Sequence, residues 1–254
     1  MPVTNATQRF SSRVDDYVQY RPGYPIEILD VLKKECGLTH DSVIADIAFG
    51  TGIFTRILLE NDNRVFGVEP NDDMRRAGEQ FLANYPNFTS VAGTAEATTL
   101  ADHSIDIITA AQAGHWFDPE KARREFIRIL KPKGWLAMIW NDRRLDSTEF
   151  QRQYETLLRT YGTDYHEVRH RGMTLAVEGF FASPPEKREF ENKQILDYAA
   201  LQGRLLSSSY IPQEDHPRHE AMLRELRHIF DENQVNGCVS FDYDTRIYFG
   251  QMNA

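Results

Sequence analysis

Residues 43–52, VIADIAFGTG, decide the fold class of this chain. Their first half, Val43–Ile47, is a nearly continuous apolar run, which is typical of a strand covered on both faces of a parallel sheet. A tight turn with Gly50 and Gly52 follows, and apolar residues then recur at helical spacing. Glycine lets the backbone approach a ligand without a Cβ in the way, and the start of a helix offers free N–H groups. The stretch therefore predicts a strand, a ligand-binding turn and a helix.

Strand and helix patterns keep alternating as far as residue 141. The helix expected after Asp118 has an N-cap aspartate, a proline in its first turn and a stop signal at residues 131–134. Such alternation predicts right-handed βαβ units in a doubly wound α/β sheet. The expected strands are Val43–Ile47, Arg64–Val68, Phe88–Ala92, Ile105–Ala111 and Trp135–Trp140.

The segments on either side break this alternation. Upstream, Pro25 marks the first turn of an expected helix. Downstream, amphipathic helices are expected after Asp146 and after Asp215. Large apolar residues alternate with charged ones over residues 241–249, and this period of two indicates a half-buried antiparallel strand that closes the sheet.

Composition excludes several classes of protein. Of 254 residues, 41% are hydrophobic and 26% are charged, a globular balance that excludes collagen-like and disordered chains. The net charge of −9, from 29 Lys and Arg against 38 Asp and Glu, disfavours nucleic-acid partners. No apolar run is long enough for a membrane span and the first residues lack a secretory signal, so we expect a cytoplasmic protein. Cys36 and Cys238 form no disulfide framework and are expected to be buried small hydrophobic residues.

Two carboxylates end neighbouring strands of the predicted sheet. Asp46 ends the first strand and can accept hydrogen bonds from a ligand ammonium group. Glu69 ends the next strand, nineteen positions after Gly50, where a carboxylate can receive both hydroxyls of a ribose. The sequence therefore predicts a crevice at this sheet edge that binds a nucleoside.

These residues resemble the class I S-adenosylmethionine-dependent methyltransferases. A further segment, YVQYRPGYP at 17–25, is similar to the N-terminal cap of small-molecule methyltransferases of the trans-aconitate type. The resemblance implies S-adenosylmethionine as cofactor and a Rossmann-like, mostly parallel sheet of seven strands, the last antiparallel, with helical cover segments. The segments that carry it, in order from about residue 10 to 141, are DIAFGTG (46–52), VFGVEP (65–70), VAGTAEATTL (91–100), IDIITAAQAGHWFDP (105–119) and REFIRILKPKGWLAMIWN (124–141).

The same resemblance implies one domain over residues 1–254, divided into four parts. These are an N-terminal helical cap (1–40), a cofactor-binding core (41–141), a substrate-cover insertion (142–188) and a C-terminal part that completes the sheet (189–254).

The resemblance also implies roles for single residues. Asp46 and the backbone of Ala48, Gly50, Thr51 and Gly52 would hold the methionine part of the cofactor. Glu69 would bind the ribose, Pro70 and Met74 would pack near the adenine, Thr94 and Ala95 would meet the adenine edge, and Ala111 and Gln112 would line the rim after the fourth strand.

Two positions depart from the family pattern. Ala48 stands where the first glycine is usual, so the backbone there must accept a Cβ, and a positive φ at this position would lower affinity. Thr94 stands where an aspartate often accepts from the adenine amino group, and a hydroxyl accepts without charge assistance. Both departures leave a non-catalytic cofactor-binding protein open as an alternative.

Methyl transfer from a sulfonium needs alignment and desolvation, and a base for some nucleophiles only. His115 is a candidate general base or substrate donor beside Trp116 as a wall, or else a rim histidine bonded to backbone. Tyr17, Tyr20 and Arg21 are candidates for a lid, with a solvated surface cap as the alternative. The resemblance implies that four further arginines lie in the substrate cover, where they are candidates to recognise an acidic substrate, although scattered arginines are commonly solvated; they are Arg143, Arg144, Arg169 and Arg171.

Two features of the sequence bear on competing functions. His166-Glu167-Val168-Arg169-His170 matches the zinc hydrolase pattern H-E-x-x-H, but it lacks an apolar face, and we expect no metal. A nicotinamide-dependent oxidoreductase also fits a glycine turn followed by an acid, yet the third glycine of G-x-G-x-x-G is missing. We therefore expect methyl transfer to an O, N or C nucleophile on a small, acidic metabolite, by a monomer or homodimer without nucleic-acid or membrane partners. The acceptor itself and its nucleophilic atom stay open.

Overall fold

The structure is a computed structural model, and it describes residues 20–163, 165, 177, 179–181, 183–208 and 210–252. Seven strands form one sheet in the order β3-β2-β1-β4-β5-β7-β6, in which β7 pairs antiparallel with both β5 and β6 and the other pairs are parallel. The predicted doubly wound, mostly parallel sheet with an antiparallel last strand is confirmed. The strands are β1 (Val43–Ile47), β2 (Arg64–Val68), β3 (Phe88–Val91), β4 (Ile105–Ala111), β5 (Leu130–Arg143), β6 (Glu186–Leu196) and β7 (Val239–Gln251).

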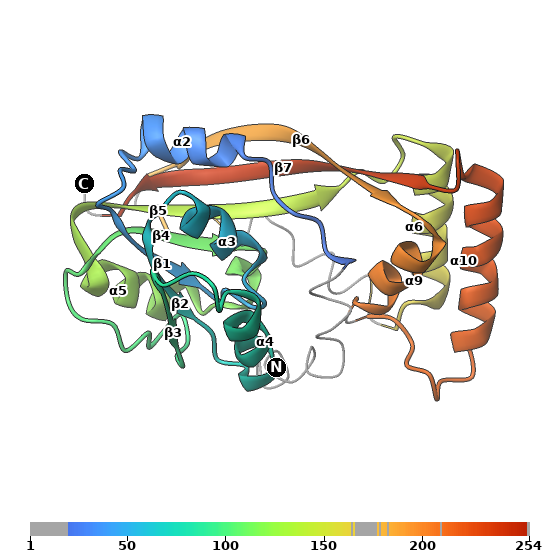
Figure 1. Cartoon of the computed structure of the whole chain (residues 1–254), viewed down its shortest axis with the longest axis horizontal. Helices are drawn as coiled ribbons and strands as arrows, with labels where there is room; N and C mark the ends of the chain where they lie inside the picture. Colours follow the sequence, from blue (N-terminus) through green and yellow to red (C-terminus); the bar gives the residue numbers. More distant parts are fainter. Residues whose placement is uncertain are drawn as a thin grey trace.

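Helices cover both faces of the parallel part of this sheet (Figure 1). On one face, α2 (Glu27–Glu35) and α3 (Ile53–Glu60) share a core with Ile44 and Phe249, and α4 (Asp72–Phe81) contacts it through Phe81. On the other face, α5 (Pro119–Ile129) packs Phe126 into a second core. The crossovers after β1 and after β4 therefore run on opposite faces, as a doubly wound sheet requires.

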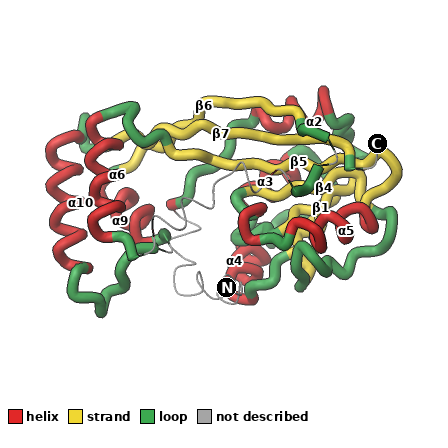
Figure 2. The backbone as a smooth tube through the Cα atoms, turned by 180° about the vertical axis from the view of Figure 1, so that it is seen from behind, coloured by secondary structure: helices red, strands yellow, loops and turns green. Residues whose placement is uncertain are grey.

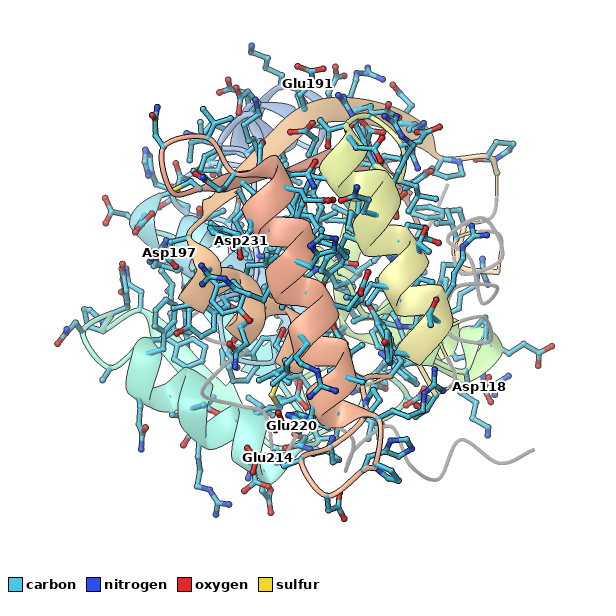
Figure 3. The ribbon with its side chains drawn as sticks, turned by 90° about the vertical axis from the view of Figure 1, so that its right-hand side faces the viewer. Asp118, Glu191, Asp197, Glu214, Glu220 and Asp231 are labelled. Atoms are coloured by element: carbon cyan, nitrogen blue, oxygen red, sulfur yellow. The ribbon has the colours of Figure 1, made fainter. Side chains whose placement is uncertain are left out.

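A separate helical unit lies at one end of the long strands. It consists of α6 (Glu149–Tyr161), α9 (Tyr198–Leu206) and α10 (His219–Asn233), and its core includes Tyr154, Leu226 and Phe241. Figures 1 and 2 show β5, β7 and β6 extending from the parallel part of the sheet to this unit. Seen end-on, α6 and α10 lie side by side, with Glu220 and Asp231 on α10 facing outward (Figure 3). The molecule thus has two lobes, which we call the parallel lobe and the helical lobe, joined by three strands.

The sequence predictions differ from the structure at three places. The helix does end before the stop signal at residues 131–134, but β5 begins at Leu130, five residues before the predicted start at Trp135. The last strand β7 buries Phe241, Tyr243 and Phe249 as its alternation predicts, but it does not close the sheet, since β6 pairs along its outer side. The edge strand β6 was not predicted, because its residues alternate between exposed and half-buried and are almost all polar.

Candidate functional site

The site lies where β1 and β4 are neighbours. Because the crossovers after these two strands leave on opposite faces, their carboxyl ends open a crevice. The residues that follow each strand, Ala48 and Gln112, both have a φ of 57°, which lies in the left-handed region. Gln112 is held there by its backbone N–H, which donates to the carbonyl of Ile139 (2.8 Å).

Asp46 is buried at the end of β1 with both carboxylate oxygens hydrogen-bonded. Thr55 Oγ1 on α3 donates to Oδ2 at 2.6 Å, and Thr109 Oγ1, its register partner on β4, donates to Oδ1 at 2.8 Å. Burial raises the pKa of Asp46 to about 6, although the two threonine hydroxyls oppose the shift. The side chain is therefore fixed in direction and titrates near neutral pH.

Glu69 is buried at the end of β2 and bridges two loops. Its Oε1 accepts from the backbone N–H of Asn71 (2.8 Å), and its Oε2 accepts from the backbone N–H of Gly50 (3.1 Å). Burial raises its pKa to about 7, while these backbone donors lower it and Asp46 raises it. Asn71 also caps α4, its side chain accepting from the N–H groups of Asp73 and Met74. The carboxylate thus fixes the glycine turn against the start of α4.

A cavity of about 1160 Å³ lies on the Glu69 side of the crevice. The residues predicted to surround the ribose and the adenine line it together: Glu69, Pro70, Met74, Thr94 and Ala95. Thr94 is exposed at the cavity mouth, and its backbone exchanges two hydrogen bonds with that of Ala97. A Cβ built on Gly50 would lie 3.4 Å from Met74, so a side chain at Gly50 would fill space between the turn and α4.

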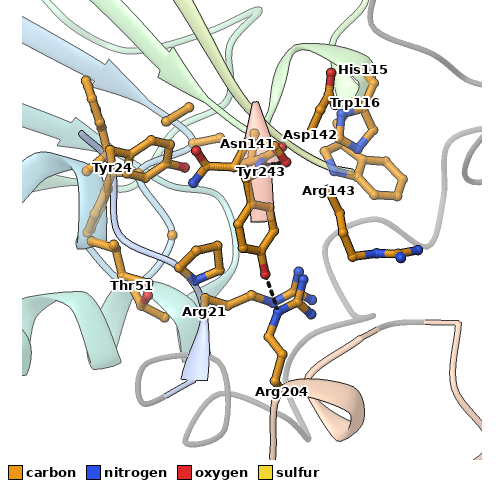
Figure 4. Close-up of a pocket in the computed structure, with 18 of the residues that line it drawn as sticks. Arg21, Tyr24, Thr51, His115, Trp116, Asn141, Asp142, Arg143, Arg204 and Tyr243 are labelled. Atoms are coloured by element: carbon orange, nitrogen blue, oxygen red, sulfur yellow. Dashed lines mark hydrogen bonds between the residues drawn. The ribbon is translucent and has the colours of Figure 1, made fainter. Parts of the chain in front are cut away.

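A second cavity of about 350 Å³ lies on the Asp46 side and reaches the helical lobe. Asp46, Thr51, His115 and Arg21 line it (Figure 4). The two cavities share the residues Ala48, Gly50, Ala111, Gln112 and Trp116. They therefore meet at the carboxyl ends of β1 and β4, as two compartments of one site.

Gly52 is the predicted cofactor residue that lines neither cavity. It takes a φ of 85° at the start of α3, and a Cβ there would lie 2.7 Å from Leu82. Its role in this structure is close packing of the turn against the residue that follows α4. Ala48, in contrast, does line both cavities with the positive φ that favours glycine.

The N-terminal segment crosses the opening between the lobes. Arg21 lines the smaller cavity and donates to the carbonyl of Ser207 (2.9 Å) at the end of α9. Tyr20 lies outside the cavity: its ring packs on Gly203 of α9, and its carbonyl accepts from Gln194 on β6 (2.8 Å). Both predicted lid residues therefore dock on the helical lobe. Tyr17 falls outside the described residues.

Arginines line the helical end of the smaller cavity, and the sequence predicted only part of this set. Arg143 lies in the cavity wall, whereas Arg144 pairs on the surface with Asp244 and Glu191 and does not line this cavity. Arg204 was missed, although an arginine between buried Leu201 and Leu205 on one helix was a usable signal. The tyrosines at 24, 165, 210 and 243 were missed as well, since an aromatic residue in a strand or helix pattern predicts core.

The competing motif cannot be placed, because residues 166–170 lie outside the described residues, as do Arg169 and Arg171. In the described ranges, no three His, Cys, Asp or Glu side chains are grouped so that they could hold a metal ion. Each helix within those ranges is too short or too polar to cross a bilayer.

Comparison with known proteins agrees with this geometry. Residues 45–138 match the family model described as a methyltransferase domain. An uncharacterized methyltransferase-like protein of Schizosaccharomyces pombe is 37% identical over 135 residues, 53% of this chain and 52% of that protein. An uncharacterized methyltransferase of Mycobacterium tuberculosis is 37% identical over 134 residues, with 53% and 52% covered. The chain thus spans about half the length of the curated relatives it matches.

Solved structures match over more of the chain. A candidate type II methyltransferase from Anaeromyxobacter dehalogenans superposes with a TM-score of 0.68 at 21% identity, covering 92% of this chain and 98% of that one. This similarity shows the Rossmann-like methyltransferase fold. Residues 45–138 therefore match a methyltransferase domain model, within a chain that has the Rossmann-like methyltransferase fold.

Proposed function

We propose that this protein transfers the methyl group of S-adenosylmethionine to a small-molecule acceptor. The observation that carries the proposal is the meeting of two cavities at Ala48, Gly50 and Gln112, with one buried carboxylate on each side. The larger cavity suits the nucleoside, and the smaller one suits the methionine part and the acceptor. A methyl group at the junction would be exposed to both.

The residues present fit this cofactor. Glu69 can accept from the ribose hydroxyls, and Asp46 can accept from the ammonium group of the methionine part. Thr51 Oγ1 is buried in the wall of the smaller cavity with no hydrogen-bond partner among the described residues, so it is available to the methionine part. When bound, the cofactor supplies an electrophilic methyl group on a positively charged sulfur.

The chain's own contribution to the reaction is alignment and exclusion of water. Gln112 and Trp116 lie at the junction, where they can orient an acceptor in line with the methyl group. Pro22 and Tyr24 line the smaller cavity, where they would help to exclude water from the reacting atoms. His115 lines the same cavity, so it is the candidate base for an acceptor that must lose a proton, while a carboxylate acceptor needs none.

Binding measurements test the cofactor assignment. We expect isothermal titration to show binding of S-adenosylmethionine and S-adenosylhomocysteine and no binding of NADH. Glu69→Gln should weaken S-adenosylhomocysteine binding by about tenfold or more, because it removes the charge from an acceptor of two hydroxyl hydrogen bonds. Glu60→Gln, on the exposed side of α3, is the matched control and should bind as the wild type does.

Turnover separates a catalyst from a binding protein. Labelled S-adenosylmethionine with a panel of small acids, amines and alcohols should give a methylated product. Tight NADH binding would overturn the cofactor assignment, and cofactor binding with no methylated product from any acceptor would favour the non-catalytic alternative.

A further inference from the structure

We infer that the helical end of the smaller cavity is an anion-binding subsite for the methyl acceptor, formed by Arg204 and Arg143. The ligand it fits is a small molecule that carries a carboxylate or a phosphate group. This inference rests on the proposed function, because it assigns the substrate class of the same site.

Arg204 is a buried cation with no carboxylate partner. It is 7% exposed on α9, between residues of the apolar core of the helical lobe. Its Nε donates to Tyr243 Oη at 3.4 Å and its Nη1 to Ser208 Oγ at 3.3 Å, so both contacts are long and both partners are neutral. No carboxylate of the described residues pairs with it. A buried guanidinium without a counter-ion is costly, and a negative ligand in the adjacent cavity would offset that cost.

Arg143 leaves a second donor unused in the same wall. Its Nη2 donates to Glu155 Oε2 (2.5 Å) and to Tyr165 Oη (3.0 Å), but its Nη1 is buried with no hydrogen-bond partner among the described residues. Glu155 is shared, because Arg159 also donates to it at 2.9 Å. One carboxylate thus serves two arginines, and a buried N–H group at the cavity wall lacks an acceptor.

Charge is separated along the cavity. Asp46 and Asp142 lie toward the sheet, where Asp46 accepts from two threonines and Asp142 pairs with Arg246. Figure 4 shows Arg143 and Arg204 in the same pocket, Arg204 with its head at the hydroxyl of Tyr243. A cofactor ammonium at Asp46 and an acceptor anion at the arginines would place the reacting atoms between them. Electrostatics would therefore select both the acceptor and its orientation.

The chemistry of the hydrogen-bond donors limits the chemical class of ligand that this subsite can bind. Planar guanidinium groups bind carboxylate and phosphate oxygens with two parallel hydrogen bonds, and charge assistance makes these contacts strong. The nearby hydroxyl of Tyr243 already contacts Arg204 and can donate to the same anion. Neutral isosteres would leave the guanidinium heads without a counter-ion and should be rejected.

Titration of the protein saturated with S-adenosylhomocysteine tests the subsite. The probes are succinate and inorganic phosphate, which separate the two sources of anion, and succinamide, which is their uncharged control. We expect at least one of the two anions to bind and succinamide not to bind. Arg204→Gln and Arg143→Gln should each weaken anion binding by about 10- to 100-fold, since each removes charge-assisted hydrogen bonds.

Two variants control for general effects. Arg144→Gln removes an arginine that pairs on the surface outside this cavity and should leave anion binding unchanged. Arg204→Lys keeps the positive charge but lacks the planar guanidinium group that can make two parallel hydrogen bonds. It should therefore bind the anion better than Arg204→Gln does. If Arg204→Gln fails to fold in a thermal melt, Arg204→Lys and Arg143→Gln carry the test.

The result that overturns the inference is separable from failure of the proposed function. If neither anion binds the saturated wild type, or if the glutamine variants bind it equally well, the subsite is wrong while the cofactor assignment stands. If Arg204→Gln weakens binding of S-adenosylhomocysteine but not of methylthioadenosine, which lacks the amino-acid part, these arginines hold the cofactor carboxylate and the inference is also overturned. If the wild type binds no S-adenosylhomocysteine, the proposed function fails.

Discussion

At the scale of single residues, Ala48 shows a conflict between sequence and backbone within the site. Its φ of 57° belongs to the left-handed region, where a Cβ clashes with the neighbouring carbonyl and costs about 1–2 kcal/mol. The chain keeps this conformation at a residue that lines both cavities, so the folded protein holds the strain at its site.

We therefore expect Ala48→Gly to raise the free energy of unfolding by about 1 kcal/mol, measured by urea denaturation. Ala77→Gly in α4, where the backbone is ordinary helix, is the matched control and should lower stability by about 1 kcal/mol. An equal decrease in the free energy of unfolding in both variants would contradict backbone strain at Ala48.

The two buried carboxylates predict a pH dependence. Burial raises the pKa of Asp46 to about 6 and that of Glu69 to about 7, above their values in an unfolded chain. Ionisation of these groups therefore lowers the stability of the free protein as pH rises from about 4 to 7. Cofactor hydroxyl and ammonium donors favour the ionised forms, so binding should reverse both pKa shifts.

Accordingly, the affinity for S-adenosylhomocysteine should rise with pH between 5.5 and 8, and binding at pH 6.5 should release protons. Titration calorimetry in two buffers of different ionisation enthalpy measures this release. Glu69→Gln should bind more weakly and release fewer protons. Proton uptake on binding would show that the ligand prefers the protonated acids.

At the scale of elements, the parallel part of the fold could be predicted because each strand is a short apolar run followed by recognisable helix signals. Asp118 does cap α5, accepting from the N–H of Lys121 at 3.1 Å, and Asn71 caps α4. The edge strand β6 could not be found, because a polar strand paired on one side has no apolar pattern to reveal it. The residues that line the crevice could be predicted because they lie at strand ends. Arg204 and Tyr243 could not, because they come from elements far apart in sequence that only the tertiary structure brings to the site.

Close packing of α4 on the glycine turn yields an element-scale prediction. A Cβ on Gly78 would lie 2.4 Å from the ring of Phe49 and 2.9 Å from the carbonyl of Gly50. Gly78→Ala should therefore displace α4 from the turn, lower stability by about 1–3 kcal/mol and weaken cofactor binding. Gly23→Ala, where a Cβ meets nothing within 4 Å, is the control for an added methyl group. Unchanged cofactor affinity in Gly78→Ala would show that the turn and α4 are not coupled.

At the scale of the whole molecule, the smaller cavity lies between two lobes that the N-terminal segment ties together. The carbonyl of Gly23 accepts from Asn141 (3.0 Å) on β5 and from Asn192 (2.9 Å) on β6, while Arg21 reaches α9. The cavity is therefore covered on this side by a segment that is held by polar contacts to both lobes and by packing of Tyr24 on Phe54.

Gly203→Ala tests this closure. A Cβ on Gly203 would lie 2.1 Å from the ring of Tyr20, so the substitution should push Tyr20 off α9. We expect weaker acceptor binding and faster proteolysis near residue 20, with a thermal unfolding midpoint close to that of the wild type. An unchanged proteolysis pattern would contradict a docking role for Gly203.

The strand β7 runs through both lobes without interruption, from Val239 near the helical core to Gln251 beside Trp135. Because β7 is hydrogen-bonded to β5 along one edge and to β6 along the other, it is rigid, and its length sets the distance between Asp46 and Arg204. The distance between Asp46 and Arg204 therefore stays the same whichever acceptor is bound. Discrimination among acceptors should then depend on how far an acceptor's anionic group lies from its methylated atom, so homologues lengthened by one methylene should be poorer substrates even where their charge is unchanged.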